Sequence, residues 1–254
     1  MKLTDTHCHF DFDAFADNRA GHWQRAQAAG VHRLLIPGVE EAQWPGLPRL
    51  CRQLPGTRYA LGLHPWWLKT ASDQWQQKLI TALNSAGNDC VAIGETGLDM
   101  ACKVPMEKQE YAFVFQLRLA CERGLPVVMH SHKTHDVLLK WLRRYPPVGG
   151  VVHGFAGSLQ QAQNFWKLGI HIGVGGTITY ERAQKTRNTM AAMPAESLVL
   201  ETDAPDMPLC GFQGQPNHPE RLPLVLQALA DIRQQPLPEL ALTLEQNAAR
   251  LLQW

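Results

Sequence analysis

Short apolar runs alternate with stretches of helical periodicity along the whole of this 254-residue chain. Most of the runs are continuous rather than alternating, which is typical of parallel strands covered on both faces. Eight runs can be marked, at residues 3–6, 34–37, 59–63, 91–94, 126–129, 150–152, 170–174 and 198–200. Between them the spacing is helical, as at Leu222, Val225, Leu226 and Leu229.

Eight strand–helix units in about 250 residues match the length of an α/β protein with the (β/α)8 TIM barrel fold. An open, doubly wound sheet is the alternative. Gly30, Gly124 and Gly169 each end a helical stretch, where a left-handed cap is expected. A Pro- and Gly-rich loop at 204–219 follows the last run, and Thr243 with Gln246 predicts a capping box that starts a short terminal helix. We expect one domain over residues 1–254.

Composition excludes several classes of protein. Lysine and arginine number 24 against 23 acidic residues, and this balance argues against a protein that coats long nucleic acid. The six cysteines form no CxxC pair, a pattern of reduced thiols rather than of a disulfide framework. Charged residues and histidines begin at Lys2, so we expect no signal peptide, no membrane association and a cytoplasmic location.

Histidines and carboxylates gather where the apolar runs end. His7 and His9 follow the first run, His64 the third, Glu95 the fourth, His130 the fifth, His153 the sixth and Asp203 the eighth. In a barrel, the carboxyl ends of the strands converge on one rim, where barrel enzymes keep their active sites. These residues are therefore expected to meet, although each taken singly could be a cap or a loop residue.

The spacing of these residues fits a metal centre. His7 and His9 are two apart, so in an extended strand both imidazoles point to one face, while Cys8 points to the other. Imidazole with carboxylate oxygen suits Zn, Mn, Fe or Ni, and Mg less naturally. Four of these histidines with the two carboxylates already exceed the needs of one tetrahedral ion, so we expect two ions, which a carboxylate such as Glu95 could bridge. His22, His32, His171 and His218 lack this placement, and His135 is expected near a helix start.

Six motifs, taken in order, resemble those of the TatD family of metal-dependent hydrolases, whose members are amidohydrolase-like barrels. They are DTHCHFD at 5–11, GLHP at 62–65, GETGLD at 94–99, HSH at 130–132, HGFAGS at 153–158 and ETDAP at 201–205. The stretches at 173–180 and 200–220 look closest to its YjjV branch. The resemblance implies a (β/α)8 barrel, two divalent ions (Zn, Mn, Mg or Ni) and a deoxyribonuclease that trims DNA from the 3′ end.

Carried over by position, the resemblance implies that one ion is held by His7, His9, Glu95 and Asp203 and the second by Glu95, His130 and His153. His64 and His132 would lie near the substrate. Family members commonly carry Arg where this chain has His132, so a phosphate contact is altered. Glu95 stands where many amide-cleaving relatives carry a modified lysine, and this favours the nuclease.

Catalysis is expected from a metal-activated water. Asp203 is the candidate general base, since a carboxylate beside the metal is within reach of the water's proton, and Glu95 is the candidate bridge. DNA ends or short single strands are the expected substrate, with no obligate protein partner.

Substrate contacts are open to two interpretations. Trp66 and Trp67 could stack a base or pack against helices, and Arg182, Lys185 and Arg187 could bind phosphate or form a solvated helix face. Two other functions stay open: hydrolysis of an amide, ester or lactone of a small metabolite, and a metal-loaded binding protein without catalysis.

Overall fold

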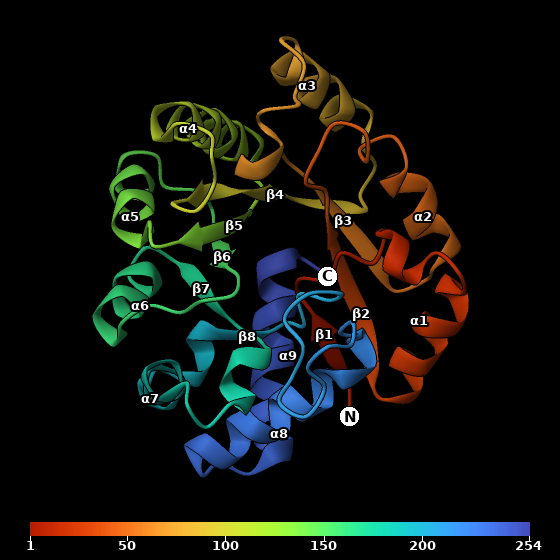
Figure 1. Ribbon diagram of the computed structural model, residues 1–254, viewed down its shortest axis with the longest axis vertical. Coiled ribbons are helices and arrows are strands. Elements are labelled where there is room, and N and C mark those ends of the chain that lie inside the picture. Colours follow the sequence, from red (N-terminus) through yellow and green to blue (C-terminus); the bar gives the residue numbers. More distant parts are fainter.

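Eight parallel strands form a closed ring with helices around its outside in the computed structural model, which describes residues 1–254 (Figure 1). The strands neighbour one another in chain order, and each pair from β1–β2 to β7–β8 is parallel. Their bounds are Leu3–Asp5 (β1), Val31–Pro37 (β2), Thr57–Leu61 (β3), Cys90–Asp99 (β4), Val127–His132 (β5), Gly150–Val152 (β6), Ile170–Val174 (β7) and Leu198–Leu200 (β8).

Each strand is followed by at least one helix. The α-helices are Arg19–Ala28 (α1), Leu47–Gln53 (α2), Trp75–Ser85 (α3), Met106–Arg123 (α4), His135–Arg144 (α5), Leu159–Trp166 (α6), Gln184–Ala192 (α7), Leu222–Arg233 (α8) and Leu237–Leu252 (α9). Short 3-10 turns occupy Asp13–Phe15 (η1), Pro65–Trp67 (η2), Gly176–Thr179 (η3), Ala195–Ser197 (η4) and Pro219–Arg221 (η5). The predicted TIM barrel is confirmed against the open-sheet alternative.

The ring closes where β8 returns to β1. The backbone N–H of Thr6 donates to the carbonyl of Leu200 at 2.9 Å, and the N–H of His9 donates to the carbonyl of Ala204 at 2.8 Å. Beyond the strands, Cys8 and Ala204 form a parallel bridge. Closure satisfies backbone groups that an open sheet would leave exposed on its edges.

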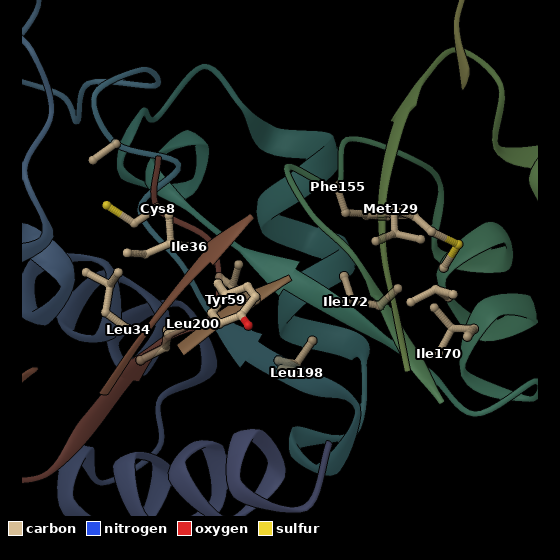
Figure 2. Close-up of a cluster of buried hydrophobic side chains, with 14 of the residues drawn as sticks. Cys8, Leu34, Ile36, Tyr59, Met129, Phe155, Ile170, Ile172, Leu198 and Leu200 are labelled. Atoms are coloured by element: carbon tan, nitrogen blue, oxygen red, sulfur yellow. The ribbon is translucent and has the colours of Figure 1, made fainter. Parts of the chain in front are cut away.

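Apolar side chains fill both sides of the strand wall. One cluster of 55 buried residues lies mainly between strands and helices, and Figure 2 shows part of it, including Cys8, Leu34 and Leu200. A smaller cluster joins Leu35, Val128 and Val199 to Ala248 and Leu251 of α9. In Figure 1, α9 lies within the outline of the strand ring. The C-terminal helix therefore packs against strand residues that belong to a cluster separate from the main core.

Several element boundaries differ from the sequence-based expectation, among them those of β4, β5 and α9. β4 continues to Asp99 and β5 to His132, because these strands keep pairing beyond their apolar runs, with Gly97 opposite His130 and Asp99 opposite His132. The predicted start of the last helix at Thr243 is wrong. α9 begins at Leu237, since Pro238 is tolerated in a first turn and the Thr243 hydroxyl donates to the carbonyl of Glu239 inside the helix.

The predicted glycine caps and the predicted position of His135 are confirmed. Gly30, Gly124 and Gly169 have positive φ, and Gly124 is the left-handed cap of α4. His135 is the first residue of α5. None of the helices is both long enough and apolar enough to cross a membrane.

Gly97 has no room for a side chain. Its φ is 144°, and a Cβ there would overlap the carbonyl oxygen of His130 on β5. Gly97→Ala is expected to destabilise the protein by more than ~2 kcal/mol, in the upper range for single substitutions, and to lower the melting temperature by more than ~4 °C. Gly87→Ala is the control because nothing lies within 4 Å of its Cβ position. Thermal unfolding followed by circular dichroism makes the comparison, and equal melting temperatures would contradict the steric argument.

Candidate metal centre

The six predicted ligands meet around the buried carboxylate of Glu95 at the carboxyl ends of the strands. Its Oε2 lies 3.2 Å from His7 Nε2 and 3.6 Å from His9 Nε2. Its Oε1 lies 2.8 Å from His153 Nε2 and 3.6 Å from His130 Nδ1. One carboxylate therefore presents a different oxygen to each of two pairs of imidazoles.

Asp203 completes the first group. Its Oδ1 lies 3.5 Å from Nε2 of both His7 and His9, and 3.9 Å from His153 Nδ1. His153 also stacks on His7, with ring centroids 3.9 Å apart, so it lies between the two groups. This arrangement corresponds to a carboxylate that can bridge two cations roughly 3.5–4 Å apart.

The closure between β1 and β8 positions the first group. The N–H of Asp203 donates to the carbonyl of His7 at 2.8 Å. Asp5 accepts the backbone N–H groups of His7 and Thr202 and the Thr202 hydroxyl, which ties the two strand ends together. Cys8, between the two histidines, is fully buried in the apolar cluster, as predicted (Figure 2). The alternation of an extended chain thus sends both imidazoles to the cleft.

The donor set fits divalent cations. His7 Nε2 and His9 Nε2 are 3.3 Å apart, and His130 Nδ1 and His153 Nε2 are 3.2 Å apart. Two bare ring nitrogens repel each other at this distance unless a proton or a cation lies between them. Roughly 3.3 Å also separates two ligand atoms that each lie about 2.0–2.1 Å from one tetrahedral ion.

The charges of the cluster suit a cation as well. Burial alone would raise the pKa of Glu95, but His153, His64 and His7 together hold it well below its usual value. Burial lowers the pKa of His7 to about 4, which leaves that imidazole neutral at neutral pH. Burial would also lower the pKa of His153, yet Glu95 raises it to about 10. A cation bound here would replace the proton that Glu95 holds on His153.

His64 lies inside this cluster, with Nε2 3.4 Å from Glu95 Oε1. Its Nδ1 accepts the backbone N–H of Trp66, and burial lowers its pKa to about 3, so it is neutral. A neutral imidazole that accepts at Nδ1 carries its hydrogen on Nε2. With this tautomer, assigned from the hydrogen bonds, His64 is a hydrogen-bond donor toward the cleft rather than a free ligand.

Asp99 is a functional candidate that sequence reasoning missed. It accepts His130 Nε2–H at 2.8 Å and Trp66 Nε1–H at 2.8 Å, and its other oxygen lies 3.0 Å from Nδ1 of the half-exposed His132. Burial would raise the pKa of Asp99, but the bonds from His130 and Trp66 hold it far below the usual range. Because Nε2 of His130 is bonded to Asp99, the lone pair of Nδ1 faces the cluster. The signal was available in GETGLD, where Asp99 lies four residues beyond Glu95.

Glu201 is a second candidate that was missed. It is fully buried, and its Oε1 accepts the backbone N–H of Gly154, next to His153. Burial raises its pKa to about 8. Gly173 leaves the space that this carboxyl group occupies, because a Cβ there would overlap it. Glu201 therefore fixes the turn that follows His153.

A cleft of about 220 Å³ opens above the cluster, lined by its histidines other than His7, by its carboxylates and by Phe12, Trp66, Trp67 and Asp206. A larger hollow of about 490 Å³ lies elsewhere, along α2 and α3, and contains no histidine. Arg187 donates to the carbonyl of Ile178, and Arg182 lies over the ring of Tyr180 at 5.1 Å. These two arginines thus have structural partners near β7.

The fold and this site define a (β/α)8 barrel with a candidate metal centre at the carboxyl ends of its strands. The family model described as TatD related DNase matches residues 4–253. The chain therefore belongs to the TatD family of metal-dependent hydrolases, as the motifs predicted.

Several relatives cover almost the whole chain. It is 46% identical to an Escherichia coli K12 protein named uncharacterized metal-dependent hydrolase YjjV, over 98% of this chain and 97% of that protein. It is 35% identical to the E. coli K12 3′-5′ ssDNA/RNA exonuclease TatD, over 93% and 94%. The crystal structure of E. coli YjjV covers 99% of this chain and 98% of its own, with a TM-score of 0.96. A TatD family structure from Entamoeba histolytica, 19% identical, shares the fold with a TM-score of 0.85 over 99% of both chains.

The hydrogen bond from His130 to Asp99 is expected to strengthen metal binding. Asp99→Asn should lower the affinity for Zn²⁺ or Mn²⁺ by roughly 10- to 100-fold, the usual cost of losing such an outer carboxylate. Competition with a fluorescent chelator measures this affinity. Asp206→Asn removes a carboxylate that lines the same cleft without a hydrogen bond to a histidine, and it should bind metal like the wild type. Equal metal affinity in the two variants would show that Asp99 does not contribute to metal binding.

Proposed function

We propose that this protein is a divalent-metal-dependent phosphodiesterase that removes nucleotides from the 3′ ends of short single-stranded nucleic acid. The observation that carries the proposal is the Glu95 carboxylate, which turns one oxygen toward His7 and His9 and the other toward His130 and His153. The name of the E. coli relative TatD, an exonuclease on single-stranded DNA and RNA, supports the choice of substrate.

The proposed ligands are His7, His9, Glu95 and Asp203 for one ion and Glu95, His130 and His153 for the other. This nitrogen-rich set suits Zn, Mn or Ni better than Mg. When bound, the ions would lower the pKa of a water molecule and would stabilise the negative charge on the phosphate oxygens.

The side chains of the protein perform the proton transfer and the orientation. Asp203 lines the cleft, and the bond from His9 lowers its pKa despite burial, so it is ionised and able to accept a proton from the attacking water. His64 presents its Nε2–H to a non-bridging oxygen of the phosphate. His132 is held by Asp99, which lines the cleft, and from there it would contact the same phosphate or the next one.

Asp203→Asn is expected to retain the fold and to lose at least ~100-fold in turnover, the scale of a lost general base. Cleavage of 3′-labelled single-stranded DNA by metal-loaded protein measures the rate. Metal content must be determined on the same sample, because Asp203 is also a proposed ligand. Near-wild-type turnover with full metal content would exclude Asp203 from proton transfer.

Metal removal and a substrate panel test the reaction class. Treatment with a chelator should abolish hydrolysis of end-labelled single-stranded DNA and of bis-p-nitrophenyl phosphate, and addition of Mn²⁺ or Zn²⁺ should restore both. The panel includes acyl esters, amides and lactones under the same conditions. Cleavage confined to acyl compounds would replace the phosphodiesterase proposal, and inactivity on every compound would favour a binding protein.

A further inference from the structure

Two adjacent tryptophans follow His64, and the structure gives them different environments. Trp67 is half-buried, packs against the main apolar cluster and contacts the His64 ring edge-on at 5.6 Å between centroids. Trp66 is 52% exposed, although both belong to η2 and both border the cleft. Trp67 is therefore accounted for by packing, whereas the exposed indole of Trp66 is not.

Trp66 is held firmly despite its exposure. Its Nε1–H donates to Asp99 Oδ2 at 2.8 Å, and its backbone N–H donates to His64 Nδ1 at 3.2 Å. The preceding Pro65 is buried and restricts the backbone. Both N–H groups of Trp66 are thus satisfied by residues of the site, which leaves a flat apolar face oriented in advance. Such preorganisation lowers the entropic cost of binding a flat group.

Other apolar side chains lie at or near the cleft. Phe12 borders the same cleft and stacks on His9 with centroids 4.7 Å apart. Met100, next to Asp99, is 60% exposed. The cluster thus combines a polar floor, suited to cations and phosphate, with apolar groups at its edge. A substrate that is only inorganic phosphate would leave these groups unused.

Charge is distributed unevenly around the mouth. The loops after β3, β4 and β5 carry the exposed Lys69, Lys103 and Lys133 against one exposed carboxylate, Asp73. The loop after β8, across the ring from β4 in the strand order, places Asp206 in the cleft. A polyanion is therefore favoured on the Trp66 side.

We propose that Trp66 is a stacking platform for the base of the nucleotide being removed, with the rest of the strand on the side of the lysines. The inference rests on the proposed function and adds the subsite that recognises the base. Aromatic faces bind every base, since each base has a π-face, so this platform selects single-stranded ends without selecting sequence. It also distinguishes a nucleotide from a bare sugar phosphate.

Binding of oligothymidylates that end in either a normal or an abasic 3′ nucleotide tests the platform. Both carry a 5′ fluorophore and phosphorothioates at the terminal linkages, so that they survive with Mn²⁺-loaded, full-length protein. Fluorescence anisotropy gives the two dissociation constants. The wild type should prefer the normal end by roughly 5- to 150-fold, the range of one base–aromatic stack.

Three variants identify the ring responsible. Trp66→Ala should abolish the preference, whereas Trp66→Phe, which retains a ring but loses the bond to Asp99, should keep most of it. Tyr111→Ala removes another exposed ring, on α4, that borders no part of the cleft, and it should behave like the wild type. An unchanged preference in Trp66→Ala, or no preference in the wild type, would overturn the inference.

The platform and the proposed function can fail separately. If the wild type cleaves single-stranded DNA yet binds both ends equally, the phosphodiesterase stands and the stacking role of Trp66 is wrong. If a base preference depends on Trp66 while only acyl compounds are cleaved, the site recognises bases but the reaction class is wrong.

Discussion

This protein is organised around the buried carboxylate of Glu95. Both of its oxygens need positively charged or hydrogen-bonding partners. The Glu95 side chain is only 2% exposed, and a buried charge of this kind is costly unless neighbouring groups compensate it. Compensation comes from imidazoles on β5 and beyond the ends of β1, β3 and β6. These segments must therefore reach one point together, which couples the chemistry of the site to completion of the barrel.

The backbone makes this convergence possible at two places. Between β1 and β8, backbone hydrogen bonds at Thr6, His9 and Asp203 bring His7 and His9 beside Asp203. On β4, Gly97 lets the strand pass closely beside His130, and the strand then continues to Asp99. A glycine is required at position 97 because β4 and β5 approach each other there too closely for a side chain.

Sequence reasoning found the ligand candidates but missed the groups that orient them. The six proposed ligands were visible because each follows an apolar run, and parallel strands in a barrel bring their ends together. Asp99 was missed because β4 was expected to end at Gly94, and nothing local shows that pairing with β5 extends the strand by five residues. Trp66 and Trp67 were indistinguishable for a similar reason, because their exposure depends on Asp99 and on the apolar cluster.

The order of residues was sufficient to specify the barrel, the family and the residue types at its rim, since strand periodicity and short motifs are local properties of the chain. Folding decided the rest: which oxygen of Glu95 faces which imidazole, which nitrogen of His130 is left free, and which tryptophan remains exposed. These features depend on strand register and on side-chain packing between segments distant in the chain, and local spacing alone does not determine which atoms meet.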